Sequence, residues 1–247
     1  MIVYIYDGSF EGLLTSVYEA YYNPVKPEEI YSEAEFTPTL LTEPVNIKSD
    51  EEKYRKVYNA IKNKISKDAL DIIYHVYLSE LKGSNTLIYN YIKLGFKLGS
   101  SVNLHMHNDI VLNIHKISKR VTYECHRMLG FIRFKEVGGM YYSSIEPDHN
   151  ILGLIASHFA ARLPNENWII HDLKRETAIF YNKKEWIIAD FNNELSNNFT
   201  IKEETEIYES LWKEFFETIA ISNRINPRLQ KRLMPVRYWK HLTEFEK

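Results

Sequence analysis

The chain has a single cysteine, no long apolar run and almost no net charge. Because Cys125 stands alone, an internal disulfide framework, an iron–sulfur cluster and a cysteine-rich zinc site are excluded on this chain. The first residues lack the basic start and apolar length of a signal peptide, and no run is long enough to span a bilayer. A formal net charge of −2 gives no global attraction to nucleic acid. We therefore expect a cytoplasmic protein that has no membrane partner and binds nucleic acid, if at all, through a local patch.

The hydrophobic pattern of the 247 residues predicts an α+β fold. We expect a single domain over 1–247, with a helical subdomain at about 50–130 and a basic C-terminal tail at about 222–247. Helical periodicity predicts helices at about 50–65, 67–82, 85–99, 107–130, 149–162 and 203–221. Alternating patterns predict strands near 131–136, 140–145, 167–171, 177–182 and 185–190. Together with the strand at the N-terminus, these are expected to form one antiparallel sheet with flanking helices. A further short extended stretch is predicted near Thr39 to Leu41.

Glu124 is the first candidate for chemistry, because it falls on or beside the apolar stripe of the helix at 107–130. A carboxylate at such a position must be paired, or its pKa must rise. Arg120 and Arg127 lie four residues before and three residues after it and can reach it on the helix surface. One interpretation is a structural Arg–Glu–Arg brace. The other is a catalytic carboxylate next to His126, since perturbed carboxylates also mark sites.

Asp148 and His149 form a second candidate, because Pro147-Asp148 before an apolar helix pattern is typical of an N-cap. His149 would then lie in the first helical turn, where unpaired backbone N–H groups attract anions, including phosphate. His171 and Asp172 end a later strand. Adjacent strand residues point to opposite faces, so at most one of these two can face a given pocket, unless the strand has already ended.

A nuclease site is one alternative for the same carboxylates. Asp148, followed later by Asp172 and Lys174, loosely matches the PD…(D/E)xK pattern of metal-dependent nucleases, in which two carboxylates hold Mg²⁺. The pattern is short, and a predicted helix separates its halves where that fold has a strand hairpin. His105 and His107 could also contribute metal ligands, although a polar loop is the simpler interpretation. The sequence therefore leaves the metal requirement open.

The C-terminal tail is the clearest electrostatic feature. Residues 222–241 carry six positive charges and no acid in a chain whose total is −2. Cations neutralise phosphates and aromatic rings stack on bases, so the segment favours nucleic-acid binding over a tail docked on an acidic patch such as 202–206. The residues expected to contact nucleic acid are Arg127, Arg175, Arg224, Arg228, Lys231, Arg232, Arg237, Tyr238, Trp239 and Lys240.

The chain resembles a bacterial family described as probable DNA metabolism or putative DNA repair proteins. The resemblance rests on YDGSFEGLLTSVYEAY, YECHRMLGFIRF, IEPDHNILGLIASHFAARLP, WIIHDLKRE and LWKEFFETIAISNRINPRLQKRLMPVRYWKHLTE, and is weakest over 24–100. The chain departs from the family's common form at Cys125, where a small residue is usual, and at Leu129, where lysine is frequent. The family positions carried onto this chain are Asp7, Gly8, Glu124, His126, Arg127, Asp148, His149, His158, His171, Asp172 and Arg175.

The resemblance implies a DNA repair or DNA metabolism protein that works with a radical-SAM partner. Members are typically encoded beside a radical-SAM protein, and some relatives are fused to a domain like uracil-DNA glycosylase. No iron–sulfur cluster is expected on this chain, so the cluster belongs to the partner. The alternatives are an enzyme in its own right, either a metal-dependent nuclease or a base-processing enzyme, and a protein-interaction module without DNA contact. The catalytic candidates of such an enzyme are Glu124, His126, Asp148, His149, His171 and Asp172.

Overall fold

The computed structural model describes residues 1–192, 210–215, 218 and 226–245. The chain forms two compact units, residues 1–122 and 123–247, and helix α5 (Asp109–Phe131) contributes residues to both. Each unit has its own sheet, which confirms the predicted α+β class. The single domain expected over 1–247 stays a prediction, and the units are described separately.

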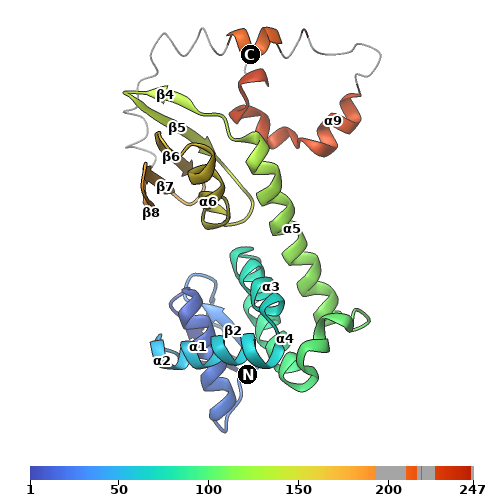
Figure 1. The fold of residues 1–247 in the computed structure, drawn as a ribbon. Helices are drawn as coiled ribbons and strands as arrows, with labels where there is room; N and C mark the ends of the chain where they lie inside the picture. Colours follow the sequence, from blue (N-terminus) through green and yellow to red (C-terminus); the bar gives the residue numbers. More distant parts are fainter. Residues whose placement is uncertain (193–209, 216–217, 219–225, 246–247) are drawn as a thin grey trace. The chain divides into compact units, whose positions relative to one another are not determined.

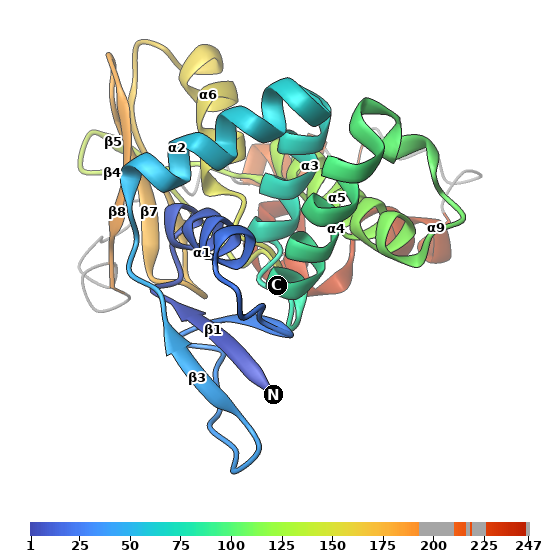
Figure 2. The same cartoon turned by 90° about the horizontal axis from the view of Figure 1, so that it is seen from below.

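The first unit contains a three-stranded parallel sheet of β1 (Ile2–Tyr6), β2 (Glu29–Ser32) and β3 (Glu43–Asn46), in the order β2-β1-β3. Helix α1 (Phe10–Tyr22) connects β1 to β2, and the Ser9 side chain caps it by accepting the Gly12 N–H. Figure 2 shows β1 beside β3, with α1 next to the sheet. The prediction that the first strand joins the later strands is therefore wrong. The predicted stretch at Thr39 to Leu41 is not a strand, because the sheet uses Glu43–Asn46 instead.

The helices predicted between 50 and 130 are present in this part of the chain. They are α2 (Glu51–Ala60), α3 (Lys67–Leu78), α4 (Ser84–Leu98) and α5, with a π-helical segment η1 (Ile61–Ile65) continuing α2 and a 3₁₀ segment η2 (Gly99–Leu104) following α4. Asp50 and Ser66 cap α2 and α3 with their side chains. The apolar faces of these helices meet β1 and α1 in one core, which includes Leu13, Ile61 and Ile92.

The second unit contains a five-stranded mixed sheet in the order β4-β5-β6-β7-β8 (Figure 1). Its strands are β4 (Lys135–Val137), β5 (Met140–Ile145), β6 (Asn167–Asp172), β7 (Thr177–Asn182) and β8 (Trp186–Asp190). Neighbouring strands are antiparallel except β5 and β6, which run parallel. Helix α6 (Leu152–Arg162) connects those two strands. The prediction of a purely antiparallel sheet is therefore wrong, because a helical crossover returns the chain in the same direction.

The described part of the C-terminal tail is folded. It contains α9 (Pro227–Leu233) and two 3₁₀ segments, η4 (Val236–His241) and η5 (Thr243–Phe245). Tyr238, Leu242 and Thr243 are buried, so this described part of the tail packs into the second unit. Residues 210–215 and 218 are helical, and the rest of the helix predicted at 203–221 lies outside the described residues. Within the described residues, no helix has both the length and the apolar character needed to cross a membrane.

Candidate functional site

Glu124 lies on α5 with only 5% of its surface exposed, and it binds the loop that precedes α6. The Asp148 N–H donates to its Oε1 (2.8 Å) and the His149 N–H donates to its Oε2 (2.9 Å). These are the backbone donors that were expected to attract an external anion, and a carboxylate of the chain occupies them. Asp148 is not the N-cap of α6, which begins at Leu152 and has no side-chain cap at Ile151. The loop between Ile145 and Leu152 is instead held by Glu124.

The brace around Glu124 comes from the C-terminal tail. The Tyr238 hydroxyl donates to Oε1 of Glu124, and an Arg237 guanidinium nitrogen lies 4.0 Å from the same oxygen. That nitrogen also pairs with Oδ2 of Asp148 at 2.5 Å. Burial and the neighbouring Glu124 carboxylate raise the pKa of Tyr238, so the phenol stays protonated and donates. The prediction that Arg120 and Arg127 brace Glu124 is therefore wrong. The carboxylate is instead braced by Tyr238 and Arg237, which are distant in sequence.

Asp172 is fully buried and holds the turn after β6. Its Oδ2 pairs with Arg175 at 2.8 Å, and its Oδ1 accepts the Lys174 N–H at 3.0 Å. Burial raises the pKa of Asp172, although Arg175 and the backbone donors partly offset this. Arg175 and Lys174 both donate from their side chains to the carbonyl oxygen of Asp148, each at 3.0 Å. Residues from the ends of β5 and β6 thus meet, but the lysine of the nuclease-like pattern binds a backbone carbonyl.

His171 and His126 are not part of this network in the described structure. His171 precedes Asp172 on β6 and therefore faces the other side of the sheet. Its Nδ1 lies 2.9 Å from the Tyr142 hydroxyl, and its ring is 4.8 Å from that of Phe191. Burial lowers the pKa of His171, partly offset by the Phe191 backbone and nearby carboxylates. His126 is exposed on α5. Of the catalytic candidates, the structure therefore brings Asp148 and His149 to Glu124, whereas His126 and His171 lie elsewhere.

The basic residues of the tail divide into paired and unpaired groups. Arg237 pairs with Asp148, and Lys240 pairs with Glu146 at 2.6 Å. The three cations of α9, by contrast, are all exposed and make no ion pair with any residue that the structure describes; they are Arg228, Lys231 and Arg232. Arg224, which was also expected to contact nucleic acid, lies outside the described residues, as does the acidic stretch at 202–206.

The two aromatic rings that were expected to stack on bases, Tyr238 and Trp239, are instead used in packing. Tyr238 is 2% exposed, and Arg237 lies over its ring at 4.6 Å. Trp239 stacks on Phe245, with 4.3 Å between ring centroids and 11° between planes, and its Nε1–H donates to the Met234 carbonyl oxygen. These rings therefore anchor the tail, and the cations of α9 are its accessible feature.

A second polar cluster lies in the first unit around Asp7, which the sequence indicates only as a family position, together with Gly8. The Asp7 carboxylate follows β1 and accepts the hydroxyls of Ser9 and Ser49, both at 2.6 Å. Burial tends to raise the pKa of Asp7, but the hydrogen bonds from Ser49 and Ser9 leave it below its ordinary value. Ser49 follows β3, and pairing between β1 and β3 could not be read from hydrophobic pattern alone. The cluster joins two strand ends to the start of α1.

No set of three or more His, Cys, Asp or Glu side chains is arranged to hold a metal ion in the described parts of the chain. The Nδ1 of His105 lies 2.9 Å from the Ser101 carbonyl oxygen, and its ring packs 5.6 Å from that of His107. These two histidines therefore belong to the polar loop that precedes α5.

Comparison with known proteins places most of this structure in one family. A family described as "Domain of unknown function (DUF4130)" matches residues 82–244, about two-thirds of the chain. The chain belongs to the DUF4130 family. The matched region runs from α4 through the tail and so includes the Glu124 network and α9. No curated protein and no solved structure matches the chain.

Proposed function

We propose that this DUF4130 protein binds DNA through α9 and acts in DNA repair or DNA metabolism beside a radical-SAM partner. The partner and the process rest on the resemblance of its motifs to the DNA metabolism family. The DNA contact rests on one observation, the exposed and unpaired cations Arg228, Lys231 and Arg232 in the described tail.

The spacing of these cations supports a phosphate-binding surface. Positions i, i+3 and i+4 share one face of a helix, so the three side chains of α9 can reach one stretch of backbone phosphates. The remaining described tail cations, Arg237 and Lys240, are paired with carboxylates of the same unit. These two ion pairs attach the tail to the rest of the unit, whereas the cations of α9 stay available to bind DNA phosphates.

The hydrogen bond between Tyr238 and Glu124 holds the segment that carries this surface in place. The buried hydrogen bond between them attaches η4 to α5, and the Trp239 Nε1–H joins η4 to Met234 at the end of α9. A ligand that binds to α9 therefore meets side chains on a folded segment, which lowers the ordering cost of binding.

Binding of labelled single- and double-stranded DNA across a salt series tests the proposal. The affinity of the wild type should fall steeply with salt, and the variant Arg228→Ala/Lys231→Ala/Arg232→Ala should bind weakly with a slope shallower by about 2 to 3. Over a tenfold rise in salt, the wild type should thus lose roughly 100- to 1,000-fold more affinity than the variant.

A matched control is available on α5. The variant Lys116→Ala/Lys119→Ala/Arg120→Ala removes three exposed cations with the same i, i+3, i+4 spacing and changes the net charge equally. It should keep the wild-type salt slope. Equal loss in both variants would show diffuse electrostatic attraction and overturn the assignment to α9. No binding by the wild type at low salt would overturn the DNA proposal itself.

A further inference from the structure

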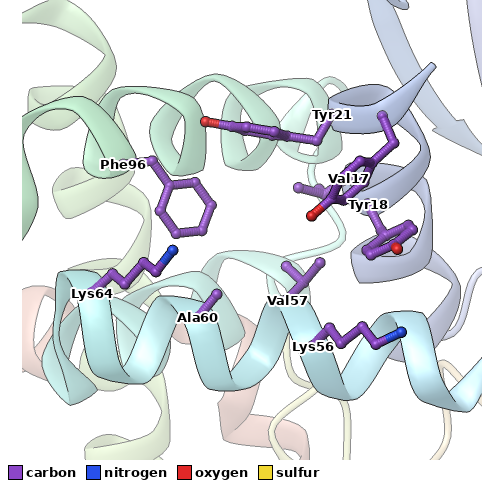
Figure 3. A pocket seen from close by; sticks show the side chains of 9 residues that line it. Val17, Tyr18, Tyr21, Lys56, Val57, Ala60, Lys64 and Phe96 are labelled. Carbon is purple, nitrogen blue, oxygen red and sulfur yellow. The ribbon is translucent and has the colours of Figure 1, made fainter.

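A separate pocket in the first unit has the chemistry to bind a nucleotide. Its volume is about 250 Å³, and it opens between α1, α2, the π-helical segment η1 and α4. None of its lining residues belongs to α9 or to the Glu124 network. The lining residues are Val17, Tyr18, Tyr21, Tyr22, Lys56, Val57, Ala60, Lys64 and Phe96 (Figure 3).

The walls of the pocket are aromatic and its floor is apolar. The rings of Tyr21 and Phe96 meet edge to face, with 5.7 Å between centroids. Figure 3 shows these rings across the opening from Val57 and Ala60 on α2. Half of the Tyr21 surface is exposed, so its ring is accessible to a ligand. Such a space suits a flat, partly apolar ring system, because aromatic faces stack on any base.

Gly95 explains how Phe96 reaches this wall. A Cβ at Gly95 would lie 2.6 Å from Cδ1 of Ile65, so the missing side chain lets α4 approach η1 closely. The buried Ile65 side chain ends the π-helical segment, and Lys64 precedes it on the same segment. π-Helical turns are rare and occur frequently at functional sites. The segment that carries Lys64 is therefore unusual both in its backbone and in its packing.

Lys64 supplies a positive charge beside the aromatic rings. Its ammonium group is directed toward Phe96 in Figure 3, and it has no ion-pair partner among the residues that the structure describes. Lys56, on the other side of the opening, lies 3.8 Å from Glu52 and over the Tyr18 ring at 5.9 Å, so its charge is already partly compensated. The pocket thus combines an accessible ring with one uncompensated cation.

We infer that this pocket binds a nucleotide, with the base against Tyr21 and the phosphate at Lys64. A volume of about 250 Å³ is just below the roughly 300–1,000 Å³ of pockets for drug-sized ligands, so it has room for one base with its phosphate at the rim. The nucleotide can be free or can be the end of a DNA strand. Both sources present the same base and phosphate.

Calorimetric titration of the full chain with deoxyadenosine 5′-monophosphate, and separately with deoxyadenosine, tests the inference. The wild type should bind the phosphorylated compound about tenfold more tightly, the size of one charge-assisted contact. Lys64→Ala should remove that difference, so that both compounds bind with the weaker affinity. Tyr21→Ala should weaken both compounds about tenfold, because both lose the same stacking contact.

Matched control variants distinguish binding in the pocket from the general effect of removing an exposed lysine or tyrosine. Lys62→Ala removes an exposed lysine of the same π-helical segment, and Tyr123→Ala removes a tyrosine with 55% of its surface exposed. Neither residue lines the pocket, so both variants should bind like the wild type. The α9 triple variant should also keep mononucleotide binding, so that failure of this inference and failure of the DNA proposal can be told apart.

A short oligonucleotide with a 5′-phosphate distinguishes the two sources of the ligand. It is titrated into the α9 triple variant with and without Lys64→Ala, so that α9 does not contribute. Binding of the oligonucleotide that depends on Lys64, without binding of the mononucleotide, would identify the strand end as the ligand. If neither ligand binds, or if Lys62→Ala costs as much as Lys64→Ala, the inference is wrong.

Discussion

Replacement of Glu124 by alanine should unfold the second unit at markedly lower denaturant concentration. The carboxylate accepts hydrogen bonds from the backbone of Asp148 and His149 and from the Tyr238 hydroxyl, and only 5% of the residue is exposed. It therefore fixes both the loop before α6 and the C-terminal tail. Removing it leaves three donors without their acceptor.

The magnitude follows from these donors. A buried donor left without a partner costs about 1–3 kcal/mol, and removing one partner of a buried ionic network costs about 3–5 kcal/mol. Water can reach part of the site, because about half of the Asp148 side chain is exposed. We therefore expect Glu124→Ala to lower the free energy of unfolding by about 3–4 kcal/mol. Tyr238→Phe removes one donor and leaves the carboxylate in place, so it should cost about 1–1.5 kcal/mol.

Tryptophan fluorescence during urea unfolding measures this effect in the correct part of the chain. The four tryptophans are Trp168, Trp186, Trp212 and Trp239, all within the unit formed by 123–247. The signal therefore reports on the unit that contains Glu124. Glu185→Ala, which removes an exposed carboxylate of the same unit, is the control and should change stability by less than about 0.5 kcal/mol.

The double variant Glu124→Ala/Tyr238→Phe completes the test. Once the carboxylate is gone, Tyr238 loses its acceptor, so the second substitution should add little to the first. Additive losses in the double variant, or a loss below about 1 kcal/mol for Glu124→Ala, would contradict the reasoning. In either case the tail would be held by its apolar contacts and not by the Glu124 network.

Three further substitutions test other parts of the structure. Burial lowers the pKa of His171, so its neutral form stabilises the fold above the ordinary histidine pKa, and this stability is lost as pH falls below about 6.5. His171→Asn should make the free energy of unfolding, measured by tryptophan fluorescence, less dependent on pH between pH 7 and 5. If this pH dependence is the same as in the wild type, His171 is not its source. Gly12→Ala would place a Cβ 2.3 Å from Oδ1 of Asp7 and should cost about 1–3 kcal/mol by far-UV circular dichroism. Gly130→Ala, in open space on α5, should instead stabilise by about 0.5–1 kcal/mol, and similar effects at both glycines would contradict the crowding argument.

The sequence predicts the elements of this fold better than their pairing. The helices between 50 and 130 lie close to their expected positions because caps and apolar periodicity are local properties. The strands of the second unit are also found, but β5 and β6 are parallel. A strand, a helix and another strand in succession favour a parallel crossover. Because α6 lies between β5 and β6, parallel pairing of these two strands is the better expectation. Strand β2 was missed because its four residues carry almost no pattern.

The candidate site shows the same limit for side chains. The sequence identifies Glu124 as a carboxylate that needs partners, and the structure confirms that it is buried and paired. The partners expected from helical spacing are Arg120 and Arg127 on the same helix. The actual partners, Asp148 and Tyr238, are 24 and 114 residues away in the chain. Only the return of β5 and of the tail to α5 brings these groups together, and no local pattern encodes that return.

The charges of the basic tail differ in whether a carboxylate of the folded chain compensates them. Residues 222–241 contain six cations and no acid, so the sequence alone suggests that all six cations are available to bind phosphate. Folding brings acids from another part of the sequence, and Asp148 and Glu146 compensate Arg237 and Lys240. Such pairs contribute little to long-range attraction, because their opposite charges cancel at a distance. Among the described residues of the tail, the uncompensated positive charge therefore lies on α9, where we propose that phosphate binds and where one triple substitution with a charge-matched control can test the proposal.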